Sequence, residues 1–492
     1  MLAAGRWHAH EVTPEGLVAG PPNIVMIIAD DLNTRIAPYV DSTLVVHTPN
    51  LDRLAESGVR FTRAYAQYPV CGPSRASIMS GLYPESNGVT GNAFDTGNHR
   101  LATPELADHP TMARFLKDNG YYTARVSKIF HVGVPGGIER GETGSDDPDS
   151  WDFAVDIMAP ETMSPGRLER LSRGQHYGSN FARMILEDGQ ESTQADVLAA
   201  DQAISILETR LRPLPSGATN RTRVKPDAPL FLALGFVRPH VPLIAPARHF
   251  DRYPEDKAPL PAVPDSDLED VPEQAARMSN ANRFGMTLEQ QRQAVAAYHA
   301  SVSFMDEQVG RVLDALERVG AADNTVIIFL SDHGFNLGEH SSWQKLSLWE
   351  ESVRVPLIIS QPGGLRGASD EIVELIDLYP TVAGLAGLEK SAPGILQGTD
   401  MLSDSDESGE AYTITSAEGG SLRTERWRYN RWGESAGLGN EELYDHANDP
   451  GEFTNLANDP AHRATLVELR TRFNEVRSNA QGFRSALSKA PD

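Results

Sequence analysis

The sequence predicts an α/β protein, because short apolar strands alternate with helices along most of the chain. An apolar, β-branched run over 23–29 is followed by a helix that begins at Pro49 and by a strand over 59–66. A helix over 111–119 then leads into a strand over 121–126. Strand, helix, strand, helix, strand is the element order of a layered α/β fold.

The alternation returns later in the chain with longer elements. Apolar strands are expected over 230–237 and 325–330. Between them, Thr287 and Gln290 have the spacing of a capping box, which predicts the start of a helix that runs to about Val319. These elements enlarge the sheet that the first part of the chain begins.

The composition changes after a helix over 377–387. Gly, Ser and Asp dominate as far as about residue 409. Two strands that form an antiparallel sheet and a terminal helix are expected after that, at 412–416, 426–431 and 463–477. We therefore divide the chain into a large domain, 1–390, and a small C-terminal α+β subdomain, 391–492.

Charge and composition exclude several classes of protein. The 492 residues include 44 basic and 68 acidic side chains, which gives a formal net charge of −24. Nucleic acids and anionic membranes bind basic surfaces, so neither is an expected partner. No stretch approaches the roughly 20 apolar residues of a membrane span. The single cysteine, Cys71, rules out an intrachain disulfide and a cysteine-based zinc or iron–sulfur site.

The first 20 residues lack the apolar segment of a signal peptide. We therefore expect a cytoplasmic protein from the chain as given, or a periplasmic or secreted one if a leader has been removed.

Acidic residues follow two of the predicted strands directly. Asp30 and Asp31 end the first strand, and Asp332 and His333 follow the strand over 325–330. In open α/β sheets, ligands bind outside the carboxyl ends of the strands. The two pairs are therefore expected to face one site, although acidic residues are also common in strand-end turns.

The segment C-G-P-S-R, from Cys71 to Arg75, is the most specific local motif. Continued as A-S-I-M-S-G, it resembles the signature of the type I sulfatases of the alkaline phosphatase superfamily, in which this cysteine is converted to Cα-formylglycine. The resemblance implies a layered fold with a large mixed, mostly parallel sheet flanked by helices, and makes 1–390 the catalytic domain. The hydrated aldehyde offers two hydroxyls: one attacks sulfur, and the other, deprotonated, expels sulfate.

The resemblance also implies a metal site. Its ligands would be Asp30, Asp31, modified Cys71, Asp332 and His333. Oxygen-rich sites of this kind suit Ca²⁺ first, with Mg²⁺ or Mn²⁺ possible. Many sulfatases have Asn or Gln where this chain has His333.

Further residues match the family's catalytic positions. Arg75 lies one turn into the helix that follows Cys71, where the helix N-terminus itself favours anions. Lys128 and His131, in S-K-I-F-H, resemble residues that bind the formylglycine hydroxyls, and the histidine would take the proton that drives sulfate elimination. His240 and Lys345 resemble the groups that protonate the leaving oxygen and bind sulfate. Arg238 stands where relatives often have lysine.

The runs S-K-I-F-H, P-H-V-P and D-H-G-F-N-L-G-E-H-S-S-W-Q-K are together most similar to the iduronate-2-sulfatase branch. We therefore expect hydrolysis of sulfate esters on a small molecule or oligosaccharide, after maturation by a formylglycine-generating enzyme. A phosphonate or phosphate ester hydrolase and a non-catalytic anion- or calcium-binding protein are the alternatives, and the oligomeric state stays open. Four aromatic residues could line a sugar subsite or simply pack in loops: His99, His340, Trp343 and Trp349.

Overall fold

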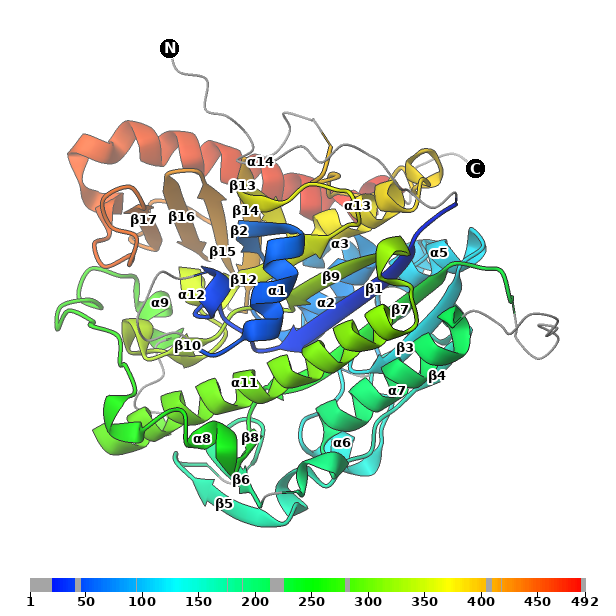
Figure 1. The fold of residues 1–492 in the computed structure, drawn as a ribbon. Coiled ribbons are helices and arrows are strands. Elements are labelled where there is room, and N and C mark those ends of the chain that lie inside the picture. Colours follow the sequence, from blue (N-terminus) through cyan, green and yellow to red (C-terminus); the bar gives the residue numbers. More distant parts are fainter. Residues whose placement is uncertain are drawn as a thin grey trace, which may run out of the picture.

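The computed structural model describes residues 20–39, 46–93, 95–174, 176–187, 189–212, 225–278, 284–403, 409–416 and 418–487 (Figure 1). The N-terminal stretch that we distinguished from a signal peptide thus lies almost wholly outside the described residues. Among the helices that are described, none has both the length and the apolar character to cross a membrane.

An eight-stranded sheet forms the centre of the molecule, in the order β13-β2-β12-β9-β1-β7-β3-β4. β1 pairs in parallel with both β7 and β9, whereas β12 is antiparallel to β9 and β2. The prediction of a mixed, mostly parallel sheet is therefore confirmed. In chain order the strands are β1 Asn23–Asp30, β2 Val59–Tyr65, β3 Tyr122–Ser127, β4 Phe153–Val155, β7 Leu230–Pro239, β9 Thr325–Ser331, β12 Arg354–Ser360 and β13 Gly367–Glu374.

Helices cover both faces of this sheet (Figure 1). β1 is buried along its whole length, and its alternate side chains enter two different cores. Val25 and Ile27 join the core under α1 Pro49–Ser57, α7 Ala195–Leu211 and α11 Leu288–Arg318. Ile24, Met26 and Ile28 join the core under α2 Cys71–Ser80, α5 Met112–Asp118 and α13 Leu378–Leu385.

The long helix α11 begins as predicted. The Thr287 hydroxyl accepts a hydrogen bond from the backbone N–H of Gln290, and the Gln290 side chain accepts one from the backbone N–H of Thr287. This reciprocal capping satisfies two N–H groups that the first turn would otherwise leave without partners.

Four antiparallel strands and a helix make up the C-terminal part. The strands are β14 Glu410–Thr415, β15 Gly419–Thr424, β16 Trp427–Trp432 and β17 Glu441–Asp445, and α14 Arg463–Leu487 packs on them. The large sheet has its last strand in sequence at 367–374, and the four-stranded sheet begins at residue 410. The boundary near residue 390 stays a prediction.

A second small sheet was not foreseen. It has the order β5-β6-β8, with bounds Gly166–Arg170, Ala182–Leu186 and Leu243–Pro246. The remaining short elements are β10 Asn336–Leu337, β11 Trp343–Gln344, α3 Pro84–Asn87, α4 His99–Ala102, α6 Gly136–Arg140, α8 Ala247–Phe250, α9 Glu273–Met278 and α12 Glu350–Val353.

Candidate active site

The pair Asp30 and Asp31 and the pair Asp332 and His333 meet at the carboxyl ends of β1 and β9. Because these strands are parallel neighbours that pair Ala29 with Ser331, their ends coincide, and Asp332 lies beside the Asp30–Asp31 pair. The backbone N–H of Asp31 donates to Oδ1 of Asp332 at 3.3 Å, and the N–H of Asp332 donates to the carbonyl oxygen of Ala29 at 3.2 Å. Asp30, Asp31, Asp332 and His333 are all fully buried. The predicted convergence of these side chains is therefore present in the structure.

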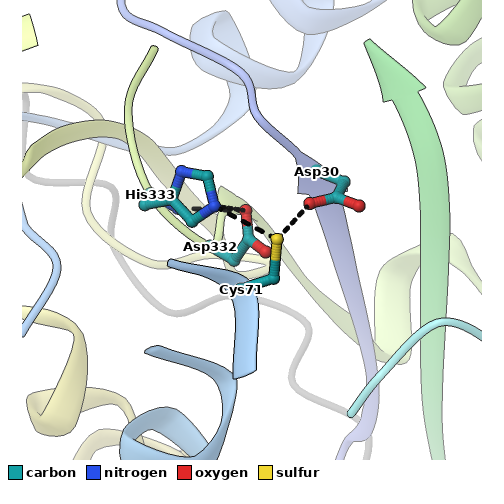
Figure 2. A group of neighbouring side chains, drawn as sticks. All are labelled: Asp30, Cys71, Asp332 and His333. Atoms are coloured by element: carbon teal, nitrogen blue, oxygen red, sulfur yellow. Dashed lines mark hydrogen bonds and ion pairs between the residues drawn. The ribbon is translucent and has the colours of Figure 1, made fainter. Parts of the chain in front are cut away.

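Cys71 is the first residue of α2 and points into this group (Figure 2). Its Sγ lies 3.2 Å from Oδ1 of Asp30 and 3.3 Å from Nε2 of His333. A Cβ on the next residue, Gly72, would lie 2.6 Å from the side-chain oxygen of Asn92. Only glycine therefore allows this close approach at the start of the helix.

Three buried or nearly buried cations each contact one of the carboxylates. Nε of Arg75 donates to Asp332 at 2.7 Å, Nζ of Lys128 donates to Asp30, and Nζ of Lys345 donates to Asp31 at 2.5 Å. Each of the three carboxylates thus has a lysine or arginine partner. Lys345 also lies 3.2 Å from Sγ of Cys71. The carboxylates of the site are thus matched by an equal number of fixed positive charges.

The cations change the chemistry of the thiol. Burial alone would raise the pKa of Cys71, but the charges of Lys345 and Lys128, with His333, hold that pKa well below its ordinary value. An anion at the position of Sγ is therefore stabilised. This electrostatic environment also favours a negatively charged oxygen at the same place.

The two remaining histidines approach the thiol and the carboxylates from other loops. His131 forms a side-chain hydrogen bond with Cys71, and burial lowers the pKa of its imidazole. His240 places Nε2 3.9 Å from Oδ2 of Asp31, while its Nδ1 lies 2.7 Å from the carbonyl oxygen of Val241. A carbonyl oxygen can only accept, so Nδ1 donates to it and Nε2 is the ring nitrogen that faces the site.

The acidic cluster has the character of a cation site. Ligand atoms of Asp30, Cys71, Asp332 and His333 lie within 4.8 Å of one another. Oδ2 of Asp31 is buried and has no hydrogen-bond partner, although buried carboxylate oxygens normally have one. Burial raises the pKa of Asp332 to about 6, against the effect of Arg75. The residues present therefore fit a divalent ion bound mainly by oxygen.

The structure brings together the residues that the sequence assigned to catalysis and metal binding. Arg238, which stands where relatives often have lysine, does not reach this group. Arg238 instead donates to the carbonyl oxygen of His240, behind the histidine. Sequence reasoning missed Tyr298, whose hydroxyl donates to the carbonyl oxygen of Asp31 at 2.7 Å. It lies on the buried face of α11, where no local motif distinguishes it from a core residue.

The four aromatic candidates for a sugar subsite are packing residues. Each is at most 2% exposed: His99, His340, Trp343 and Trp349. His340 stacks on Trp349 with ring centroids 4.3 Å apart, and His99 packs on His109. The alternative of ordinary loop packing accounts for all of them.

Comparisons with known proteins identify the family of the chain. The sulfatase family model matches residues 22–136 and 188–388, and the model of the N-sulphoglucosamine sulphohydrolase C-terminal region matches 338–479. A sulfatase from Formosa agariphila is 32% identical over 464 residues, which are 91% of this chain and 85% of the relative. Iduronate 2-sulfatase of Mus musculus is 34% identical over 411 residues, which are 74% of this chain and 69% of the relative.

A solved structure, the phosphonate monoester hydrolase of Silicibacter pomeroyi, matches with a TM-score of 0.73 at 23% identity, over 93% of this chain and 96% of that one. The fold is therefore that of the alkaline-phosphatase-like hydrolases. The family matches go further, and the chain belongs to the sulfatase family. Its activity is that of a sulfuric ester hydrolase.

Proposed function

We propose that this sulfatase hydrolyses sulfate esters on saccharides, with Cys71 as Cα-formylglycine and one divalent ion. The observation that supports the proposal most is the position of Cys71. It begins a buried helix, within hydrogen-bond distance of Asp30, His333 and Lys345. A formylglycine hydrate at this position supplies a hydroxyl that attacks sulfur and a second one that allows sulfate to leave.

The ion would be held by Asp30, Asp31, Asp332 and His333, together with the modified Cys71. When bound, it supplies positive charge that polarises the sulfate oxygens. Three carboxylates already face three fixed cations, so a divalent ion would leave the site positive by two charges. That balance suits an anionic ester.

The donor set favours a hard ion, with Ca²⁺ before Mg²⁺ or Mn²⁺. Elemental analysis of the active protein is expected to find calcium or magnesium near one equivalent, and Asp31→Asn should lower that content. Stoichiometric zinc without either ion would overturn the assignment.

Different side chains of the protein would carry out the two proton transfers, one to the leaving oxygen and one during release of sulfate. Nε2 of His240 faces the site, and Lys345 lies beside Cys71, so these two are the candidates for protonating the leaving oxygen. His131 bonds to Cys71 and has a lowered pKa, which makes its neutral imidazole the candidate base for release of sulfate. Arg75 and Lys128 would hold the nucleophile and the sulfate through fixed charges.

The saccharide class is suggested by the similarity to iduronate 2-sulfatase. A phosphonate or phosphate ester hydrolase is the second candidate, because the phosphonate monoester hydrolase shares the fold. We expect a 2-O-sulfated uronic acid disaccharide to give a higher kcat/KM than a phosphonate monoester of similar size. The reverse order would replace the proposal by the second candidate.

The state of Cys71 is tested separately. Intact mass of the peptide that contains it, taken from protein made with a formylglycine-generating enzyme, should show the aldehyde. Protein made without that enzyme should keep the thiol and lack turnover. A thiol in fully active protein would contradict the proposed nucleophile and favour a different reaction or a non-catalytic role for this site.

A further inference from the structure

A group of buried charged side chains lies directly behind His240, outside the site described so far. We call it the Arg238 cluster, and it consists of Arg238, Glu161 and Asp196. Arg238 is at the end of β7, Glu161 is in a short 3₁₀ turn and Asp196 is in the first turn of α7. Their exposed fractions are 2%, 0% and 1%. Three charged groups buried this deeply have a high desolvation cost unless they are fully paired.

The cluster is built around one short segment, the turn over 237–242. Oδ1 of Asp196 accepts from the backbone N–H of Val237 at 2.7 Å, and Oδ2 accepts from that of Arg238 at 3.0 Å. Nη1 of Arg238 donates to the carbonyl oxygens of His240, at 2.9 Å, and of Pro242. Both ends of the turn are therefore held by side chains that come from behind it.

Glu161 completes the arrangement. One of its carboxylate oxygens accepts from Nη2 of Arg238, and this fixes the plane of the guanidinium. Its backbone φ is 43°, in the left-handed region that non-glycine residues seldom adopt. Strained conformations of this kind persist where the surrounding structure enforces them, and they are most frequent at functional sites.

The result is a fixed orientation of the His240 ring. The backbone N–H of His240 donates to the carbonyl oxygen of Val237 at 2.9 Å, and Nδ1 lies 2.7 Å from the carbonyl oxygen of Val241. With the backbone of the turn held from behind and Nδ1 bonded to Val241, Nε2 points toward Asp31 and Cys71. The cluster itself contacts the turn rather than the reacting groups.

We propose that Arg238, Glu161 and Asp196 are positioning residues that keep Nε2 of His240 aimed at the oxygen of the leaving alcohol. The inference rests on the proposed function and on His240 as the leaving-group acid. A general acid that is misaligned by a fraction of an ångström loses much of its effect. The cluster therefore sets how well the enzyme cleaves esters of weakly acidic alcohols.

Lysine at position 238 is the informative substitution, because it keeps the charge and loses the planar, multiple donation. We compare kcat for an alkyl sulfate, whose alcohol needs protonation, with kcat for a nitrophenyl sulfate, whose phenol does not. The ratio of the two values is independent of the fraction of folded, matured enzyme. A purely structural role would lower both rates together and leave this ratio unchanged.

Arg238→Lys is expected to lower the alkyl-to-aryl ratio by about tenfold or more, toward the value of His240→Ala. The double variant Arg238→Lys/His240→Ala should have the same alkyl-to-aryl ratio as His240→Ala alone, because both changes act on the same proton transfer. Glu161→Gln keeps the shape of the side chain and should lower the same ratio by a smaller factor. This variant tests the inference if Arg238→Lys does not fold.

Arg428→Lys provides the matched control. Arg428 is 1% exposed and is paired with Glu350 and Glu452 in the C-terminal part, away from His240. It should lower stability without changing the ratio. An unchanged ratio in Arg238→Lys and Glu161→Gln, beside a normal fall in His240→Ala, would overturn this inference alone. If His240→Ala also left the alkyl-to-aryl ratio unchanged, His240 would not be the leaving-group acid, and the inference would fail with it.

Discussion

The two candidate proton donors, His240 and Lys345, are held by different means. The turn over 237–242 is held by buried charged side chains that bond to its backbone. The loop over 338–347 carries Lys345 and has an irregular backbone that stacking, hydrogen bonds and an ion pair support. Its φ angles are positive at Gly338, His340, Ser341, Gln344 and Leu346.

Side-chain contacts of several kinds support this loop. His340 stacks on Trp349, and its Nδ1 lies 3.1 Å from both oxygens of Asp267. Nδ2 of Asn336 donates to the carbonyl oxygen of Gln344 at 3.1 Å, next to Lys345. Substitutions in the Arg238 cluster should therefore act through His240, whereas changes in the loop should act through stability and through Lys345.

Loss of Cys71, the residue on which His240 and Lys345 are both proposed to act, should have the largest effect. Cys71→Ala removes the proposed nucleophile, and we expect turnover of alkyl and aryl sulfates to fall by about 10⁴-fold or more. Circular dichroism should show an intact fold, because the change removes a single sulfur atom. If the variant were as active as the unaltered protein, Cys71 would not be the nucleophile. His240 and Lys345 would then have no role in a reaction at this residue.

Removal of His240 should separate the two substrate types. For His240→Ala we expect a loss of about 10³-fold on an alkyl sulfate and of about tenfold or less on a nitrophenyl sulfate, because the phenol leaves without a proton. Steady-state kinetics on both esters measure this. Equal losses would assign the acid role to Lys345 instead.

Removal of Lys345 should lower both rates alike. Its Nζ contacts Asp31 and Cys71, so Lys345→Met removes fixed charge that every sulfate ester would use. We expect a loss of about 10²-fold on either substrate. A selective loss on the alkyl ester would show that Lys345 shares the protonation step.

The smallest effect concerns the ion pair of His340 with Asp267. Burial lowers the pKa of His340, but Asp267, with Glu351 and Glu452 nearby, raises it above the ordinary 6.5. The unfolded imidazole titrates near 6.5, so the pair stabilises the fold fully below that pH and loses its effect as the pH rises through the folded pKa.

Asp267→Asn should therefore lower the free energy of unfolding by about 1–3 kcal/mol at pH 6 and by less at pH 9. Denaturant titrations at the two pH values measure the difference. A loss that grows with pH would mean that His340 is neutral in the folded protein and that the loop is held by other contacts.

The sequence predicted the residues of the site better than their supports. Asp30 and Asp332 are recognisable because each follows a continuous apolar strand, and Cys71 because its motif is local. Glu161 and Asp196 have no such signal, since they lie 77 and 42 positions from Arg238 in segments without a motif. Contacts of this kind are decided by tertiary structure.

Three strands of the large sheet escaped prediction for physical reasons, and β4 is one of them because it is only three residues long. β12 contains Pro356, which has no N–H to donate and argues against a strand. The structure places it where the register shifts between Val355 and Leu357. β13 is an edge strand with a polar sequence, so it lacks the apolar pattern that identified the central strands.

The burial of Cys71 has a consequence for the timing of the maturation proposed above. Its side chain is 1% exposed, and among the groups that enclose it are His333 and Lys345, which follow 262 and 274 positions later. A ribosome adds about 5–20 residues per second, so the thiol emerges on the order of 10–50 s before these residues exist. A modifying enzyme that acts on the nascent chain therefore competes with the speed of translation, and slow codons between positions 71 and 333 would lengthen the interval in which it can act.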